Sequence, residues 1–205
     1  MKLPGFDKEF EYNKWETGIA SSETGTAYSA ADHAAFLKGR EELADFLKSY
    51  GNKTFDNGLY RTHSLDSAIK WTRLLEEYYP DFKGKISCFG YDWEGNMMVQ
   101  RMDGKESVVM IFECATGDYF ELEQTITGFH EEDLVDYKDD TIHEEKFLLV
   151  TSHLGISSIS RNDCIAHKIS LLLDGEDVAE NMEVTDMEVN WSLQQQIMDE
   201  INKMP

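Results

Sequence analysis

Apolar residues recur every three or four positions in two stretches of the first 80 residues, which is the spacing of one face of an α-helix. The first stretch spans 29–50, and Gly39 marks a break in it. The second begins after Ser64, whose hydroxyl suits a helix N-cap, and ends before Pro80. The pattern predicts helices in both stretches. The first 30 residues, rich in Gly, Ser and Thr around 17–29, predict an irregular leader.

From Lys85 onward the apolar period changes from about 3.6 to 2, which is the period of a β-strand. Short turns separate the alternating segments, and Gly95 and Gly117 lie in two of these turns. Strand segments joined by glycine turns at a spacing of about ten residues predict an antiparallel meander. Its four predicted strands cover 85–91, 96–102, 107–113 and 119–123.

The remainder of the chain mixes both periods. Phe129, Leu134 and Tyr137 are spaced to face inward on a helix, with the carboxylates between them outward. The predicted elements are helices over 127–137, about 142–154 and 193–201, a strand or buried extended segment over 165–173, and a short strand over 186–191.

These elements predict an α+β fold in which N-terminal helices precede an antiparallel meander sheet packed by helices. A hydrophobic content of 41% over 205 residues is enough for a folded core rather than disorder. We expect an N-terminal helical extension over 1–52 and an α+β domain over 53–205, forming one compact unit.

Several features predict a cytoplasmic protein. No apolar run approaches the roughly 20 residues of a membrane span, and the first residues lack the apolar segment of a secretory signal. Cys88, Cys114 and Cys164 are odd in number and form no CxxC pair, so we expect reduced thiols in the core.

The charge is strongly negative and unevenly distributed. The chain has 40 acidic and 19 basic residues, a formal net charge of −21, and residues 86–205 hold 26 of the acidic and 7 of the basic ones. Such a surface repels nucleic acids and anionic membranes, so neither is expected as a direct partner.

Two tracts concentrate this charge. Residues 131–145 hold eight carboxylates and one lysine, and residues 169–202 hold nine carboxylates and no basic residue. A dense acidic field predicts a docking face for a basic partner. A generally acidic proteome or a halotolerant host would produce the same pattern, so charge alone leaves both interpretations open.

Catalytic signatures are missing from the sequence. It contains no GxGxxG or GxxxxGK[ST] phosphate loop, no GxSxG elbow and no HxxxH pair. Cys164 and His167 lie three apart, on opposite faces of a strand, and the carboxylates after His130 suit the first turn of a helix. Asp174, Glu176 and Asp177 lack the alternation of a calcium loop. We therefore expect no enzyme, no cofactor and no bound metal.

Four segments carry a family resemblance: Gly90-Tyr-Asp-Trp-Glu-Gly, the Val108–Asp118 strand and turn, Phe129-His-Glu-Glu-Asp-Leu-Val-Asp-Tyr, and Cys164–Trp191. In these segments the chain resembles, over about 55–195, the C-terminal domain of type VI secretion immunity proteins, which often accompanies a GAD-like domain. The resemblance implies an inhibitor that neutralises a cognate toxin, a DNase in the best-known case.

The chain departs from this family at several positions. The family usually shows a run Tyr-Lys-x-Pro-Leu-Phe-Leu-Gly-Gly-Glu-Asp, whereas His167, Ser170, Leu172 and Asp174 replace its Tyr, Pro, Phe and first Gly here. Residues 1–50 do not resemble the GAD-like domain. The chain also resembles the broader SUKH-like (SMI1/KNR4-like) immunity proteins, which remain an alternative family.

The leading hypothesis is a non-enzymatic immunity-type protein that binds a basic, nucleic-acid-cleaving toxin through an acidic face. The alternatives are a carboxylate-based divalent-metal enzyme and an intracellular SMI1/KNR4-like regulatory scaffold. The candidate toxin contacts are Glu131, Glu132, Asp133, Asp136, Asp139, Asp140, Asp174, Glu176 and Asp177.

Of the two tracts, we expect 131–145 to dominate binding because a helix holds its charges rigidly. Reversing its charges should then abolish protection against the toxin. Apolar residues interrupt the 174–188 tract, so we expect much of it to be packed inward. The interrupting residues are Val178, Met182, Val184, Met187 and Val189.

Overall fold

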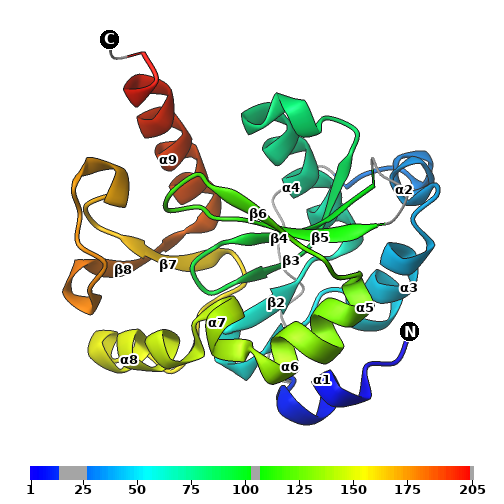
Figure 1. The fold of residues 1–205 in the computed structure, drawn as a ribbon, viewed down its shortest axis with the longest axis horizontal. Helices are drawn as coiled ribbons and strands as arrows, with labels where there is room; N and C mark the ends of the chain where they lie inside the picture. The colour runs from blue at the N-terminus through cyan, green and yellow to red at the C-terminus, as the bar shows by residue number, and fades with distance from the viewer. Residues whose placement is uncertain (14–26, 103–106, 204–205) are drawn as a thin grey trace.

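The computed structural model describes residues 1–13, 27–102 and 107–203. Its centre is a six-stranded antiparallel meander in which each strand pairs with the next along the chain (Figure 1). The predicted α+β class and the four predicted strands are confirmed, and two short strands precede them. The sheet comprises β1 (Thr54–Phe55), β2 (Tyr60–Thr62), β3 (Ile86–Asp92), β4 (Met97–Arg101), β5 (Val108–Phe112) and β6 (Tyr119–Leu122).

The helices of the first half follow the apolar periodicity. Gly39 has φ +72° and separates two helices, and the Ser64 hydroxyl accepts a hydrogen bond from the backbone N–H of Ser67 at the start of the next one. The prediction of an irregular leader is wrong for the first residues, which form a short helix. Phe6 in this helix and Leu3 directly before it are buried. The predicted leader over 17–26 lies outside the described residues. These helices are α1 (Pro4–Glu9), α2 (Ala30–Leu37), α3 (Glu41–Tyr50) and α4 (Leu65–Tyr78).

The predicted helix over 127–137 is a broken series of short turns. It opens as α5 (Ile126–Gly128), widens into the π-helical turn η4 (Phe129–Asp133) and closes as α6 (Leu134–Asp136). Phe129 and Leu134 are buried as expected, but Tyr137 is exposed, because its backbone leaves the helical conformation before α7 (Lys138–Ile142) begins. The last helix of this region is α8 (Glu144–Leu154).

The C-terminal part forms a separate two-stranded sheet of β7 (Asp163–His167) and β8 (Met182–Asp186). The predicted strand over 186–191 is wrong: the Asp186 carboxylate accepts a hydrogen bond from the Val189 backbone N–H and thereby caps α9 (Met187–Ile201). The segment 168–181 between the two strands contains two short 3₁₀ turns, η5 (Leu171–Leu173) and η6 (Ala179–Asn181).

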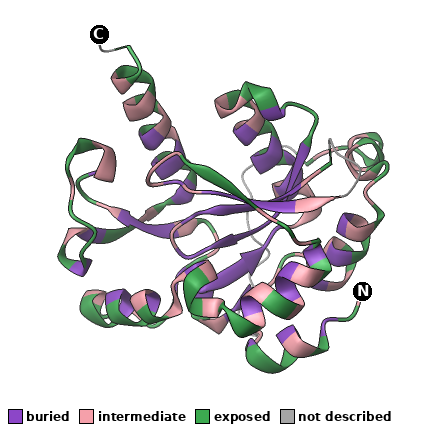
Figure 2. Ribbon diagram, in the orientation of Figure 1, coloured by how far each residue is buried: buried purple, intermediate pink, exposed green. Residues whose placement is uncertain are grey.

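The six-stranded sheet separates two hydrophobic clusters, because alternate residues of each strand point to opposite faces. Val109 and Ile111 contribute to the larger cluster and Met110 and Phe112 to the smaller one. Helices α1, α3 and α5–α8 cover the first face, and α4 and α9 cover the second (Figure 2). The N-terminal helices thus share the main core of the sheet.

The three cysteines are buried and form no disulfide, which confirms the prediction of core thiols. Burial raises the pKa of Cys88 and of Cys164 to about 12, and it raises that of Cys114 as well. A thiol with such a high pKa carries little thiolate, so these side chains are packing groups rather than nucleophiles.

Candidate functional site

The two acidic tracts meet at an open pocket of about 310 Å³ between the α7–α8 junction and the segment 168–181. The first tract contributes Asp139 and Glu145, and the second contributes Asp177. His143 and Lys146 complete the lining. Three carboxylates and two basic side chains therefore face one cavity, although they come from segments more than 30 residues apart.

The α7–α8 junction explains how one side of this pocket is built. His143 adopts a left-handed backbone conformation, with φ +53°, and this ends α7 immediately before α8 begins. The Asp139 carboxylate then accepts a hydrogen bond of 2.8 Å from the Glu145 backbone N–H, one of the free donors in the first turn of α8. Asp139 and Glu145 are consequently held close together at the pocket.

A largely buried carboxylate binds two of the side chains that line the pocket. Glu94, in the turn between β3 and β4, accepts hydrogen bonds from His143 Nδ1 at 2.9 Å and Lys146 Nζ at 2.8 Å. The turn is fixed on either side, because the indole N–H of Trp93 donates to the Ile142 carbonyl and that of Trp191 donates to the Gly95 carbonyl. The chain thus places a negative charge in contact with the two basic side chains.

The ionisation of these groups follows from their contacts. Burial by itself would raise the pKa of Glu94, but the hydrogen bond from His143 and the charge of Lys146 lower it. The same hydrogen bond raises the pKa of His143, and Glu94 and Asp177 raise that of Lys146 against the effect of burial. Asp92 is buried beside them, and burial raises its pKa to about 7. The inner network therefore favours an anionic Glu94 held by cations.

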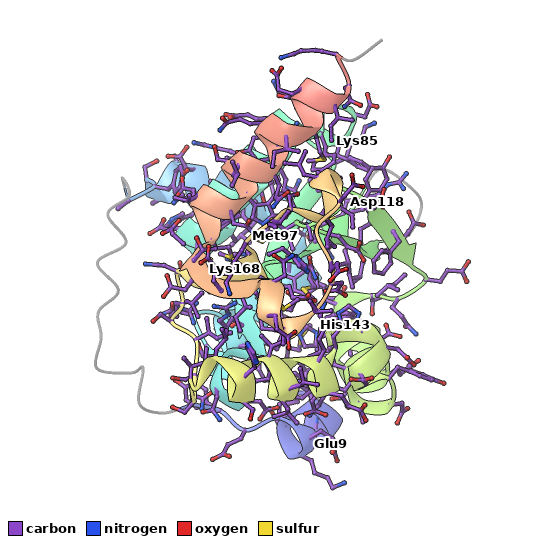
Figure 3. All side chains as sticks on the ribbon, turned by 90° about the vertical axis from the view of Figure 1, so that its left-hand side faces the viewer. Glu9, Lys85, Met97, Asp118, His143 and Lys168 are labelled. Carbon is purple, nitrogen blue, oxygen red and sulfur yellow. The ribbon has the colours of Figure 1, made fainter. Side chains whose placement is uncertain are left out.

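Lys146 links this network to the second tract. Its ammonium lies 2.7 Å from Asp177, which also accepts a hydrogen bond of 2.9 Å from His167 Nε2. Figure 3 looks onto this side of the molecule, with α8 crossing its lower part and His143 labelled at the junction. Because Asp177 already forms an ion pair with Lys146 and accepts a hydrogen bond from His167, this side chain is poorly disposed to share a cation with Asp174 and Glu176. Among the described residues, no group of three or more His, Cys, Asp and Glu side chains is arranged to hold a metal ion.

Only some of the carboxylates that the sequence predicts on the outer side of 131–140 are exposed there. Glu132, Asp136, Asp139 and Asp140 are exposed. Glu131 does not point outward as expected: its carboxylate accepts hydrogen bonds from the backbone N–H groups of Gly5 at 3.1 Å and Phe6 at 3.2 Å.

Asp133 is also partly withdrawn from solvent. Its side chain is half-buried, and burial, followed by the charge of Glu132, raises its pKa. Within this region the π-helical turn changes the direction of the side chains relative to a regular α-helix. A prediction based on the α-helical period therefore placed Glu131 and Asp133 on the outer face.

The second tract is more exposed than the sequence predicts. Asp174 and Glu176 are exposed and form no ion pair with a basic residue in the described part of the chain. Met182 and Met187 are buried as expected. The expectation that much of the tract is packed and only part of its charge points outward is wrong, because β8 lies at the edge of a two-stranded sheet and 174–178 lies in a connecting segment. The interrupting residues that are exposed are Val178, Val184 and Val189.

Sequence reasoning missed Glu94, His143 and Lys146, which organise the pocket. Glu94 lies within a segment that predicts a turn. Its partners lie about 50 residues further along the chain, and no local pattern indicates that they contact it. A usable signal is the spacing of His143 and Lys146, because residues three apart lie on the same side of a helix.

Comparisons with known proteins place the fold but give no function. The crystal structure of Atu4351 from Agrobacterium tumefaciens is similar over 95% of this chain and 89% of that chain, with a TM-score of 0.63 and 14% sequence identity. This likeness concerns the fold alone. No family model and no curated protein matches the chain. None of the described helices combines the length and apolar character that crossing a bilayer requires.

Proposed function

We propose that this protein is a non-enzymatic, immunity-type inhibitor that binds a basic toxin domain in the cytoplasm. The observation that carries the proposal is the meeting of the two acidic tracts at one pocket, which Asp139, Glu145 and Asp177 line together with His143 and Lys146. Surface charge that served solubility alone would not need to converge on one cavity.

A nuclease is the class of toxin that suits this surface best. An enzyme that cleaves nucleic acid attracts phosphate, so the approach to its active site is positively charged. A protein with exposed carboxylates can bind that positive surface and exclude the substrate. Exposed Asp136, Asp140, Asp174 and Glu176 add to the negative field around the pocket.

The test is the protein encoded by the gene directly beside this one. Cells that produce its basic domain should grow only when this protein is also present. In purified form, the nuclease activity should fall linearly with added inhibitor and reach zero at a fixed stoichiometry, because a binding mechanism consumes one inhibitor for each toxin.

Two results would contradict the proposal. Failure of the wild-type protein to bind the neighbouring gene product would remove its partner. Complete loss of toxin activity at a small fraction of the stoichiometric amount would indicate that this protein acts as an enzyme.

A further inference from the structure

Large apolar side chains are exposed on three elements at the side of the molecule that faces the viewer in Figure 3. They belong to α8, to the segment 168–181 and to α9, and we call this side the C-terminal face. Contiguous apolar surface on a soluble protein marks an interaction site more often than isolated exposed residues do. Its exposed apolar members are Leu148, Leu149, Ile169, Leu173, Val178 and Leu193.

Hydrogen bonds join the three parts of this face. The backbone N–H of Ile169 donates to Asn181 Oδ1, and Asn181 Nδ2 donates back to the Ile169 carbonyl, each at 2.9 Å. Asn181 belongs to η6, which packs against α8. At the other end, the Ser170 hydroxyl donates to Gln194 of α9 at 2.6 Å. The segment 168–181 therefore bridges the two helices.

The geometry of α9 turns Leu193 toward this face. Glu188 pairs with Lys70 of α4, and α4 lies on the opposite side of α9 from the segment 168–181 (Figure 1). Leu193 follows Glu188 by five residues, which corresponds to about 140° around a helix with 3.6 residues per turn. Leu193 is thus directed away from Lys70, and it adjoins Gln194, which accepts a hydrogen bond from Ser170 of the segment 168–181.

The charge around these apolar residues is negative. Asp174, Glu176 and Glu180 are exposed on the bridging segment, whose one basic residue is Lys168, and Lys168 donates a hydrogen bond of 2.9 Å to the Glu180 carbonyl. On α8, Leu149 lies one turn beyond Glu145 and Lys146, which line the pocket. The face thus combines apolar anchors and a carboxylate rim with a pocket at its edge that is lined by three carboxylates, His143 and Lys146.

We infer that the C-terminal face is the docking surface for a basic protein whose lysine and arginine side chains surround an apolar patch. One of those basic side chains would bind Asp139 and Glu145 at the pocket, because Asp177 is already paired with Lys146. This inference rests on the proposed function and names where the partner binds. A second copy of this chain fits the face poorly, because the carboxylates of the two copies would repel each other.

The outer side of α5–α7 lacks this combination. Tyr137 is the exposed large apolar residue of the described segment 126–143. Exposed charges at the rim of an interface mainly raise the association rate, whereas desolvated apolar anchors slow dissociation. The α5–α7 side can therefore steer the partner, while the C-terminal face retains it.

Two substitutions test the inference against a matched control. Leu149→Arg and Leu173→Arg each add a positive charge and remove an apolar anchor from the C-terminal face. Tyr137→Arg makes the same kind of change on the α5–α7 side, and Tyr137 is 58% exposed against 61% for Leu149 and 55% for Leu173. Substitutions at such exposed positions should leave the unfolding midpoint nearly unchanged.

The probe is the purified basic domain encoded by the adjacent gene, with binding measured by surface plasmon resonance. We expect Leu149→Arg and Leu173→Arg to weaken binding at least tenfold, mainly through faster dissociation, and Tyr137→Arg to change it less than threefold. Leu149→Ala, which adds no charge, should also accelerate dissociation.

The outcomes separate the two proposals. If the wild type binds the domain but Leu149→Arg and Leu173→Arg bind equally well, the location is wrong while the proposed function stands. If the wild type does not bind, both fall. If sedimentation shows a wild-type dimer that Leu149→Arg converts to a monomer without any partner, the face serves self-association and the inference is wrong.

Discussion

At the scale of single residues, His130 shows how burial fixes a protonation state. The ring is fully buried, with Nδ1 donating to the Ile126 carbonyl at 2.7 Å and Nε2 2.9 Å from the Tyr60 hydroxyl. Because a carbonyl oxygen only accepts, Nδ1 carries the proton and Nε2 accepts from Tyr60. Burial lowers the pKa of His130 to about 3 from its ordinary value of 6.5.

This protonation state predicts acid sensitivity. Between about pH 6.5 and pH 3 the unfolded chain binds a proton at His130 that the folded chain does not, so stability is lost as the pH falls through this range. We expect His130→Gln to lower the free energy of unfolding by about 2 kcal/mol at pH 7.5. At pH 4.5 the wild type loses stability, so the gap in unfolding free energy between the two proteins should narrow by about 2 kcal/mol. Urea unfolding at both pH values measures this gap.

His63 is also buried, and burial lowers its pKa, but it is common to the wild type and the variant. The comparison between the two proteins therefore isolates His130. An equal gap at both pH values would show that His130 is not held neutral.

At the scale of elements, Glu131 anchors α1 rather than a partner. Its carboxylate accepts the backbone N–H groups of Gly5 and Phe6, in the first turn of α1. Removing the carboxylate leaves both donors without that acceptor, so we expect Glu131→Ala to lower the free energy of unfolding by about 1–2 kcal/mol. Denaturant unfolding at neutral pH measures the loss.

Glu132→Ala is the matched control, since it removes the neighbouring carboxylate from an exposed position. It should change the free energy of unfolding by less than about 0.5 kcal/mol. Equal effects of the two substitutions would contradict the anchoring role of Glu131.

The success of sequence reasoning also varies by element. Helix α4 and strands β3–β6 were predictable, because the apolar period and the turn residues agree there. The six residues of α1 are too few to show a period, and its helix depends on the distant Glu131. The β8–α9 boundary was missed because Asp186 ends one element and caps the next.

At the scale of the whole molecule, the candidate site depends on contacts between distant segments. The sequence predicts two acidic tracts but not that Asp139 and Asp177 line one pocket, nor that Glu94 binds two of the side chains that line it. It also misplaces Glu131, whose role depends on α1. Composition can predict the sign and amount of the charge. The meeting of the two acidic tracts at one pocket depends on how the chain folds.

The global charge predicts salt-sensitive association. Changing Glu132, Asp136 and Asp140 to Lys alters the charge by +6 at exposed positions, so the fold should remain intact. We expect association with the basic domain to slow about tenfold at 50 mM NaCl and dissociation to change little. Stopped-flow kinetics measures both rates.

Raising the salt to 500 mM should slow wild-type association and narrow its difference from the triple variant, because ions screen exposed charges beyond a few ångströms. Identical wild-type association rates at 50 and 500 mM would rule out electrostatic steering.

The segment 168–181 has an evolutionary consequence. Its exposed residues Ile169, Leu173 and Val178 belong to neither hydrophobic cluster beside the central sheet. Mutations at these positions alter the shape and chemistry of the surface at little cost to stability. Descendants of this chain could therefore exchange one binding specificity for another by drift in a single connecting segment, with the inherited scaffold unchanged.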